Sequence, residues 1–576
     1  MITNTNQFDR DSVLHSSICI IGGGASGVSL ALELEKSGLD IILIESGGRK
    51  TDLETQQLTE GIVNNDAHYP LNKYHFRKLG GKTTVWGGRC VSFDDIDFES
   101  RDFVDHSGWP FLKNELNPYY SRAQKYLMVG EYEYDAKKVF GDSNKSMIEG
   151  FQSEYVQTNS LERFSLPVNF GLHYNRVLIN SKNIQVILKG NCTHLSVNED
   201  GNNIKDITVQ SLEGNQIKVK SNLFILASGA LDTTKLLLSS NEKHSNGIGN
   251  FSGHLGKFYM DHIYGTLGTI KLNPKTKCFL DYEKTKENIY CRKRFTLSSK
   301  AQREFGLLNF AAFTNHNYNP FIEDPKHNSG ALSAKYLIRR LRELIRPNGD
   351  LFQNQKFTGT YTVKEHLNNL SSDLPGILNT AGKYIKGNIP GQRKLPGLFI
   401  ENKQKEHPIF FQAEQAPNIN STISLSNEKD RLGLPKLIVD WQYLDIDIDT
   451  IVGAYQILNK ELEDGGFGKL NYNKENFREE IEKQMVVGNH PSGTTRMAKQ
   501  EKDGVVDPDC KVFGVNNLFV ASSSVFPTSS HANPTLTIVA IAMKVAEKVK
   551  RMALVKTEIP SPSIQTIQKD QPLKAD

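Results

Sequence analysis

SSICIIGGGASGVSLALELEKSGLDIILIES, residues 16–46, is the stretch that decides the fold. It opens with a short apolar run and a glycine turn, followed by small and apolar residues at helical spacing that end at Gly38. A second apolar run, of the kind found in buried parallel strands, ends at Glu45. The stretch therefore predicts a strand, a helix and a second strand, which form one βαβ unit.

The glycines of this unit predict a binding site for a dinucleotide. Gly22 permits a tight turn, Gly24 lets a pyrophosphate approach the backbone, and Gly27 lets the helix pack closely on the strand. The helix N-terminus would offer N–H groups and the positive end of its dipole to the phosphates. Glu45 lies eighteen positions after Gly27, where an acidic side chain accepts hydrogen bonds from a ribose and disfavours a 2′-phosphate. NAD and FAD both remain compatible with this motif.

The length of 576 residues predicts two domains. Residues 17–256 are expected to form the first part of the nucleotide-binding domain, and alternating apolar residues at 183–220 predict an antiparallel meander within it. Residues 257–480, a patchwork of short strands and loops, are predicted to form a substrate-binding domain. The strand-and-helix style returns at 481–552, so the two ends of the chain are expected to close the first domain together. The polar, proline-bearing tail at 556–576 is predicted to be disordered.

The composition is that of a globular protein without a strong charge bias. The net charge of +4 gives no reason to expect a nucleic-acid partner. The six cysteines include no CxxC pair, which argues against a zinc site or a disulfide framework and favours a reducing, cytoplasmic location. We find no secretory signal and no apolar run long enough for a transmembrane helix. A basic amphipathic helix is expected at 335–347, where a solvated arginine face is favoured over a membrane-surface or partner-docking role.

Several motifs along the chain are similar to those of the glucose–methanol–choline (GMC) oxidoreductases. They are GGKTTVWGGRC at 80–90, SGWP at 107–110, LFILASGALDTTKLLLSS at 223–240, GNFSGHLGKFYMDH at 249–262, NHPSGTTRM at 489–497 and SSHANPTLT at 529–537. The resemblance runs from about residue 17 to residue 551, and FFQAEQ at 410–415 with KLIVDW at 436–441 is most similar to the pyranose 2-oxidase branch. It implies an α/β fold, α+β overall, in which a Rossmann-like FAD-binding domain joins a mixed antiparallel-sheet substrate domain.

The resemblance implies two catalytic side chains, His490 and Asn533, which lie before the flavin on the substrate side. His531 is the alternative to one of them, because some family members use a second histidine near this position. A histidine with a pKa near neutrality is suited to take the hydroxyl proton of an alcohol, and an asparagine can hydrogen-bond the same oxygen. Proline follows both His490 and Asn533 and restricts their backbones toward extended forms.

The resemblance also implies which residues line the cofactor and the substrate. Gln412 and Glu414 match a substrate-facing stretch of the sugar oxidases, with a solvated sheet face as the alternative, and His531 is assigned to the same side. Val85 stands where pyranose and choline oxidases carry a histidine bonded to the flavin, so FAD is predicted to be non-covalent. No metal site is predicted. Beyond the βαβ unit, the residues expected along the cofactor are Gly80, Gly81, Thr83, Val85, Trp86, Gly87, Asn533, Pro534 and Thr535.

These features predict an FAD-dependent enzyme that oxidises a CH–OH group, with a sugar or polyol as the favoured substrate. His490 is the expected base, and the hydride is expected to pass to N5 of the flavin. A dehydrogenase is favoured over an oxidase because the WGG segment departs from the sugar oxidases, and the electron acceptor stays open between a quinone, a carrier protein and oxygen. Two alternatives also stay open: an FAD-containing lyase of the same fold, and a flavin-binding partner protein without turnover.

Overall fold

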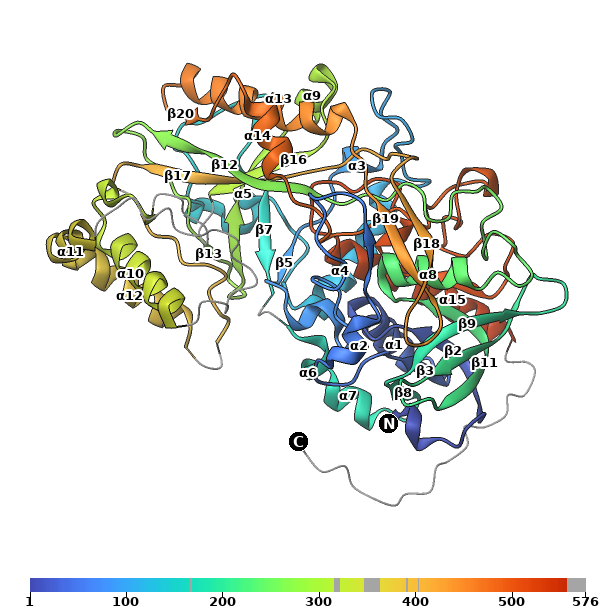
Figure 1. Cartoon of the computed structure of the whole chain (residues 1–576). Coiled ribbons are helices and arrows are strands. Elements are labelled where there is room, and N and C mark those ends of the chain that lie inside the picture. The colour runs from blue at the N-terminus through green and yellow to red at the C-terminus, as the bar shows by residue number, and fades with distance from the viewer. Residues whose placement is uncertain (166–167, 315–321, 346–362, 390–391, 402, 557–576) are drawn as a thin grey trace.

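The computed structural model describes residues 1–165, 168–314, 322–345, 363–389, 392–401 and 403–556 (Figure 1). Its largest sheet has eight strands in the order β1-β8-β3-β2-β11-β10-β9, and β21 pairs with β11. The strands are β1 (Ile2–Asn4), β2 (Val13–Ile21), β3 (Ile41–Ile44), β8 (Ile184–Leu188), β9 (Asn191–Val197), β10 (Ile204–Gln210), β11 (Gln216–Leu226) and β21 (Leu518–Val520).

The centre of this sheet is the βαβ unit that the sequence predicts. Strand β2 pairs in parallel with β3, with Ile18 opposite Ile41, and α1 (Ala25–Glu35) connects them. Strand β11 lies parallel to β2 on the other side and is followed by α8 (Gly229–Ser239). The last strand, β21, adds in parallel to β11, and the final helix α15 (Thr535–Lys556) packs on α1 and on α4 (Lys113–Leu127). The two ends of the chain therefore meet in one sheet, as expected.

The predicted meander at 183–220 is wrong for its first strand. Strand β8 pairs in parallel with both β1 and β3, and only β9, β10 and β11 form an antiparallel meander. All five residues of β8 are buried, including Gln185, because the strand lies inside the parallel part of the sheet. Strand β1 at the edge also shows that the sheet begins before residue 17.

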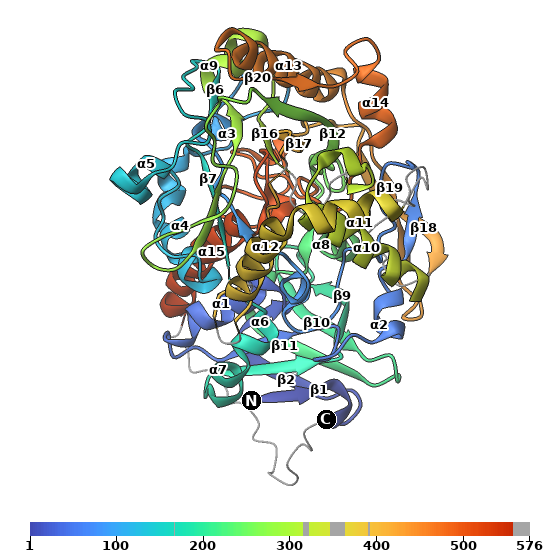
Figure 2. The same ribbon diagram turned by 90° about the vertical axis from the view of Figure 1, so that its left-hand side faces the viewer.

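A second sheet of six strands lies at the opposite end of the molecule from the first (Figure 2). Its order is β20-β12-β17-β16-β15-β6, and smaller sheets have the orders β13-β14-β7-β5 and β18-β19-β4. Strands β4 to β7 come from residues 61–164, so the chain crosses to these sheets well before residue 257. The strands are β4 (Gly61–Val63), β5 (Arg89–Cys90), β6 (Val156–Gln157), β7 (Leu161–Phe164), β12 (Ile263–Leu272), β13 (Glu283–Lys284), β14 (Tyr290–Lys293), β15 (Phe295–Leu297), β16 (Phe310–Thr314), β17 (Glu406–Ala413), β18 (Thr422–Lys429), β19 (Pro435–Asp440) and β20 (Gly468–Asn471).

Helices cover the outer side of the second sheet and form a cluster beside it. Helix α13 (Asp445–Asp464) contributes Ile448, Ile451 and Leu458 to the apolar core of this region, and α14 (Phe477–Gln484) packs against it. The cluster consists of α10 (Gly330–Ile345), α11 (Val363–Ser372) and α12 (Leu374–Gly387), which face the viewer in Figure 2. The remaining helices are α2 (Leu53–Gln57), α3 (Asp95–Phe98), α5 (Ala136–Phe140), α6 (Phe170–His173), α7 (Asn175–Asn180) and α9 (Ser299–Phe305).

Two predictions concern segments at the edge of what the structure describes. The basic helix expected at 335–347 is present as the C-terminal part of α10, and residues 346–347 lie outside the described residues. Of the predicted disordered tail, residue 556 ends α15 and 557–576 lie outside the described part. Within the described ranges, no helix is both long and apolar enough to cross a membrane.

The motifs at 249–262, 489–497 and 529–537 come together near the start of β12. Two isolated bridges join the chain around the start of β12 to the segments on either side of His490, pairing Met260 with Ser492 and Tyr264 with Val486. The segment 521–534 runs from β21 to α15 through almost completely buried residues. The segments around His490 and before α15 therefore lie beside the start of β12.

Candidate active site

The structure brings His490 and Asn533 together, although they are 43 positions apart. The side-chain nitrogen of Asn533 lies 3.3 Å from Nε2 of His490. His490 sits in the segment that bridges to β12, and Asn533 directly precedes α15. Both side chains are partly exposed, whereas the histidines behind them, His262 and His531, are buried. The pair is therefore partly accessible to solvent on one side, which we call the opening, and has a buried polar layer behind it.

His262, at the start of β12, is the second neighbour of His490. Its Nδ1 lies 2.9 Å from Nδ1 of His490, and its Nε2 lies 3.1 Å from the carbonyl oxygen of Ser529. Because a carbonyl can only accept, Nε2 of His262 must donate and Nδ1 of His262 must accept. The proton between the two rings therefore belongs to Nδ1 of His490, and Nε2 of His490 is unprotonated, with a lone pair that accepts from the amide nitrogen of Asn533.

Arg89, on β5, fixes the orientation of the Asn533 amide on the other side of His490. Its Nε donates to the side-chain oxygen of Asn533 at 2.6 Å, so the amide nitrogen of Asn533 must point to His490. The hydrogen bonds thus form one directed chain from Arg89 through Asn533 and His490 to His262 and the Ser529 carbonyl. The donor at one end of this row of hydrogen bonds, Arg89, and the acceptor at the other end, the Ser529 carbonyl, assign the same form to His490. It is a neutral ring with its proton on Nδ1.

The backbones of the two histidines are clamped by one carboxylate. Asp261 accepts from the backbone N–H of His490 through one oxygen and from that of His262 through the other, each at 2.8 Å. Burial raises the pKa of Asp261, an effect opposed by these backbone bonds and by the positive charge of Lys82. Lys82 itself donates to the backbone and side-chain oxygens of Asn489. The clamp ties the loop of His490 to the start of β12.

The electrostatic surroundings keep His490 neutral. Burial lowers the pKa of His490 well below its ordinary value, and the neighbouring His262, Lys82 and Arg89 lower it further. Burial also lowers the pKa of His262 to about 4. At neutral pH both rings are therefore uncharged, as the directed chain requires.

Gln412, on β17, is the centre of the layer behind the pair. Its side-chain nitrogen donates to the backbone oxygen of His531 at 2.6 Å and lies 3.1 Å from Nδ1 of His262, while its oxygen accepts from Arg89. The prediction that Gln412 belongs to the site fits this placement. His531 joins through its backbone, and its ring turns to Arg294, which lies 2.8 Å from its Nε2.

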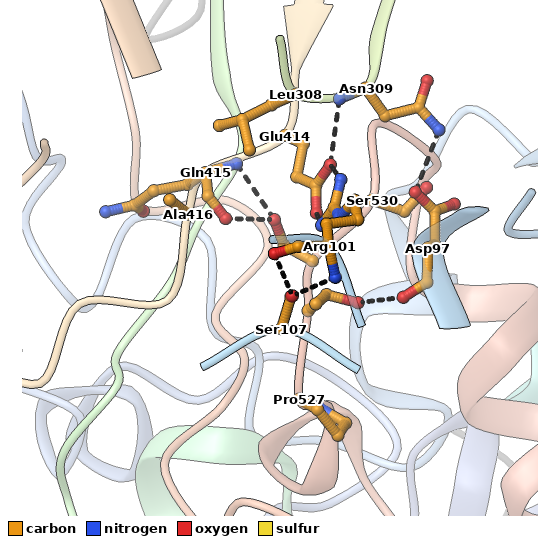
Figure 3. A network of polar contacts seen from close by, with 12 residues as sticks. Asp97, Arg101, Ser107, Leu308, Asn309, Glu414, Gln415, Ala416, Pro527 and Ser530 are labelled. Carbon is orange, nitrogen blue, oxygen red and sulfur yellow. Dashed lines mark hydrogen bonds and ion pairs between the residues drawn. The ribbon is translucent and has the colours of Figure 1, made fainter. Parts of the chain in front are cut away.

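Glu414 lies in a different polar network, shown in Figure 3. Its two oxygens accept from both terminal nitrogens of Arg101, at 2.8 and 2.6 Å, and one of them also accepts from the backbone of Asn309 at 2.9 Å. Glu414 is fully buried. This carboxylate holds the segment after α3 to the second sheet, and its predicted contact with a substrate has no support in this geometry.

The glycine-rich turn fits a dinucleotide. A side chain at Gly27 would place its Cβ 1.8 Å from the carbonyl oxygen of Gly22, whereas one at Gly24 would meet no atom within 4 Å. Helix α1 also begins without a side-chain cap at Gly24, which leaves its first N–H groups available to phosphate. A cavity beside this turn is lined by Ile21, Gly22, Ile44, Ser46, Leu58, Arg77, Gly190, Asn191, Cys192, Ser228, Asp232, Lys235, Leu236, Asp430, Leu432 and Leu434.

Glu45 lies next to this cavity and braces the turn. Its carboxylate accepts from the backbone N–H groups of Gly23 and Gly47, each at 2.8 Å, and from the Ser46 hydroxyl at 3.1 Å. A carboxylate has about four lone-pair sites, so the predicted bond to a ribose is compatible with these contacts.

The segment at 80–87 lies against the same turn. The backbone of Gly80 donates to the carbonyl oxygen of Gly23 at 2.8 Å, and Gly81 approaches Gly24 closely. Thr83 is buried, Trp86 donates to the carbonyl of Val168 at 2.9 Å, and Val85 is 49% exposed. The residues predicted along the cofactor in the segment 80–87 therefore lie next to those in the glycine-rich turn at 22–27. In the described part of the chain, no group of His, Cys, Asp or Glu residues is arranged to hold a metal ion.

Sequence reasoning missed three residues of the site: Arg89, Asp261 and His262. Arg89 is the last residue but one of the motif GGKTTVWGGRC, and Asp261 and His262 are the last two residues of GNFSGHLGKFYMDH, so all three stand within motifs of the sequence analysis. Nothing in the spacing shows that His262 meets His490 across 228 positions.

Comparison with known proteins agrees with this arrangement. The family model described as GMC oxidoreductase matches residues 417–542. The 2-methyl-1,2-propanediol dehydrogenase of Mycolicibacterium austroafricanum is 20% identical, with 96% of each chain covered. The pyranose 2-oxidase of Tricholoma matsutake is 40% identical over 63 residues, which are 11% of each chain.

The fold is that of a solved formate oxidase, with a TM-score of 0.53, 16% identity and coverage of 95% of this chain and 99% of the other. The full-length relative, the matched C-terminal segment and the common fold agree with the motifs at the site. Residues 417–542 therefore match the GMC oxidoreductase family, and the motifs along the rest of the chain resemble the same family.

Proposed function

We propose that the protein is an FAD-dependent oxidoreductase that converts a CH–OH group of a sugar or polyol to a carbonyl. The observation that carries this proposal is the directed hydrogen-bond chain, which leaves Nε2 of His490 unprotonated at an opening beside Asn533. A diol dehydrogenase and a sugar oxidase among the relatives support the substrate class. The open direction at Gly24, the uncapped helix and the adjacent cavity fit FAD.

His490 is the base of the reaction. Oxidation breaks the O–H and C–H bonds of the alcohol and forms a C=O bond, so a proton and a hydride must both leave. Bound FAD supplies the acceptor of the hydride. Nε2 of His490 takes the hydroxyl proton, and the side-chain nitrogen of Asn533 donates to the same oxygen and holds the carbon in place. The bond of 3.3 Å between these two nitrogens is long, so a substrate hydroxyl can replace it at little cost.

His262 is a positioning residue in this mechanism. Nδ1 of His262 accepts a hydrogen bond from the Nδ1–H group of His490. This bond selects the tautomer of His490 in which the unprotonated Nε2 faces the opening. Asp261 holds the backbones of both histidines and fixes the distance between their rings. The base is therefore ready before the substrate arrives, which lowers the cost of orienting it in the transition state.

Flavin bleaching by alcohols without oxygen is the direct test. The holoenzyme is mixed anaerobically with sugars, polyols and simple alcohols, and the flavin absorbance is followed. We expect His490→Ala to keep FAD but to lower the rate of bleaching roughly 100- to 10,000-fold, the usual effect of losing a general base. His15→Ala, at an exposed position on β2, is the matched control. An unchanged rate in His490→Ala would show that another group is the base, and a flavin that no alcohol bleaches would favour a lyase or a non-catalytic role.

We also propose that FAD is held without a covalent bond and that the enzyme acts as a dehydrogenase. Val85 offers no nucleophile at the position where relatives attach the flavin. Acid precipitation should therefore release the yellow cofactor into the supernatant, whereas a coloured pellet would show a covalent bond. For the acceptor, reoxidation of the bleached enzyme by a quinone should be faster than reoxidation by air, and the reverse order would identify an oxidase.

A further inference from the structure

Three arginines are gathered behind Asn533 around a single buried carboxylate. Glu162, on β7, accepts from Nε of Arg292 at 2.7 Å and forms a second, 3.3 Å contact with Nε of Arg89. Arg294, which lies between β14 and β15, contacts His531 at 2.8 Å and Ser160 at 2.7 Å. The pairing of β7 with β14, which sets Arg292 opposite Glu162, brings these charges together.

The positive charges of this cluster outnumber the negative ones. Among the described residues, Glu162 is the one fully buried acid that forms ion pairs in this cluster: it contacts Arg89 and Arg292, and its charge also acts on Arg294. Asp94, whose side chain is 44% exposed, lies at the rim, 3.8 Å from His531, and its charge acts on Arg294. Glu414 is held by Arg101 through both oxygens. Three guanidinium groups thus face at most two carboxylates, which leaves at least one buried positive charge uncompensated, a costly arrangement without an anionic partner.

The uncompensated charge is directed at the catalytic pair. Arg89 has the most accessible side chain of the three, 18% exposed against 7% for Arg292. Its Nε is bonded to the amide of Asn533, whose nitrogen is in turn bonded to His490. An alcohol placed at His490 is therefore one residue away from the guanidinium of Arg89.

The cluster is held rigidly. The guanidinium of Arg292 lies 3.7 Å from the ring centre of Phe313, and that of Arg89 lies 5.2 Å from the same ring. Nε of Arg294 is buried and has no hydrogen-bond partner among the described residues. Burial, with the charges of Arg292 and Arg294, lowers the pKa of Arg89 to about 10, so this side chain is still charged at neutral pH. A fixed cation with unused donors behind it is typical of a site for an anionic oxygen group.

We propose that the substrate carries an anionic oxygen group, a carboxylate or a phosphate, which binds at Arg89 while its hydroxyl lies at His490. The substrate is then an acidic sugar or polyol. This inference rests on the proposed function and narrows its substrate class. Arg89 is the residue that distinguishes an acidic from a neutral substrate, and Arg292 and Arg294 raise the positive potential behind it.

Matched pairs of neutral and acidic sugars test the proposal on the holoenzyme. Anaerobic bleaching is measured with glucose, gluconate, glucuronate and glucose 6-phosphate. We expect an acidic member to have a kcat/KM roughly 10- to 100-fold above that of glucose, as a hydrogen bond to a charged group provides. The advantage should decrease with salt. Preference for gluconate or glucuronate identifies a carboxylate, preference for glucose 6-phosphate identifies a phosphate, and equal or better use of glucose overturns the inference while leaving the proposed function intact.

Variants of Arg89 separate substrate binding from other roles. Arg89→Met should abolish the preference for the acidic sugar, and Arg89→Lys should restore part of it because it keeps the charge. Arg303→Met, at a half-exposed ion pair with Glu99, is the control. If Arg89→Met slows the neutral and acidic sugars by the same factor, Arg89 acts on the base or the flavin and the inference is wrong.

Equilibrium binding provides a readout that does not need turnover. Glucuronate and inorganic phosphate are titrated into the oxidised holoenzyme, and the change in the flavin spectrum is recorded. We expect saturable binding in the unmodified protein and in Arg303→Met, and at least tenfold weaker binding in Arg89→Met. If no alcohol bleaches the flavin yet these anions bind through Arg89, the proposed function fails and the anion site stands. If no anion binds in the unmodified protein, the anion site itself is refuted.

Discussion

Replacing His262 by phenylalanine tests whether this residue selects the tautomer of His490. The ring shape is kept, but the acceptor at 2.9 Å from Nδ1 of His490 is lost. In the variant the productive tautomer has a buried Nδ1–H without a partner, which costs about 1–3 kcal/mol, whereas the other tautomer turns its proton toward Asn533 and the opening. Since each 1.36 kcal/mol is tenfold in rate, the limiting rate of flavin bleaching should fall roughly 10- to 100-fold.

The assay is anaerobic stopped-flow bleaching at saturating alcohol, repeated across pH. KM should change little, because His262 does not face the opening. Loss of His262 also removes one of the influences that lower the pKa of His490, so the acid limb of kcat/KM should move to higher pH. His262→Asn, which places an oxygen acceptor near the position of Nδ1, should recover part of the rate.

The matched control is His366→Phe, which removes another buried histidine that bridges Ser333 and a backbone carbonyl far from this site. It should leave the rate unchanged. A limiting rate in His262→Phe within twofold of the unmodified protein would refute the tautomer argument, as would an equal loss in His262→Asn and His262→Phe.

Two further predictions concern stability and cofactor binding. Burial lowers the pKa of His262 to about 4 in the folded protein, whereas the same ring in the unfolded chain is protonated below about pH 6.5. The stabilisation from the neutral ring is therefore complete above pH 6.5 and is lost as the pH falls toward 4. The stability advantage of the unmodified protein over His262→Phe, measured by urea unfolding, should therefore shrink by about 2 kcal/mol between pH 7 and pH 5, and an advantage that grows on acidification would contradict this sign. For the cofactor, Gly27→Ala should destabilise even the FAD-free protein by about 1–3 kcal/mol or more, because its Cβ meets the Gly22 oxygen at 1.8 Å. Gly24→Ala should leave that stability unchanged but weaken FAD binding, which thermal unfolding and a flavin titration distinguish; equal behaviour of the two variants would mean that Gly24 does not face the cofactor.

Local patterns were sufficient for the parts of the fold made by neighbouring residues. The βαβ unit at 16–46 follows from apolar periodicity and glycine placement, and the structure confirms it. The strand β8 was misassigned because an alternating reading of its residues does not show that both faces are covered. No sequence pattern predicts that β7 pairs with both β5 and β14, because these pairings join segments that are far apart along the chain.

In the candidate site, too, motifs identify some residues, whereas the roles of others depend on contacts between distant segments. His490 and Asn533 were identified through motifs whose order along the chain is sufficient, and the geometry then brings them into contact. The residue that orients His490 cannot be predicted from the sequence, because the role of His262 depends on which of its ring nitrogens contacts the Ser529 carbonyl. The role of Arg89 depends on the balance of charges from three separate strands, and no sequence pattern reports that balance.

The closure of the first sheet by the C-terminal segment has a consequence for biosynthesis. Strand β11 pairs with β21 and helix α1 packs on α15, and both partners come from the end of the chain. The Ser26 hydroxyl also donates to the Ala521 carbonyl at 2.5 Å. A ribosome that has made the first 500 residues has therefore delivered the glycine-rich turn, but not the strand and helix that pack against it. The nascent chain would expose the apolar flank of β11 during this time, and stable insertion of the flavin must follow release of the C-terminal segment. The first sheet of this protein can therefore be completed only after synthesis of the C-terminal segment, so its assembly depends on flavin supply at the end of synthesis rather than at its beginning.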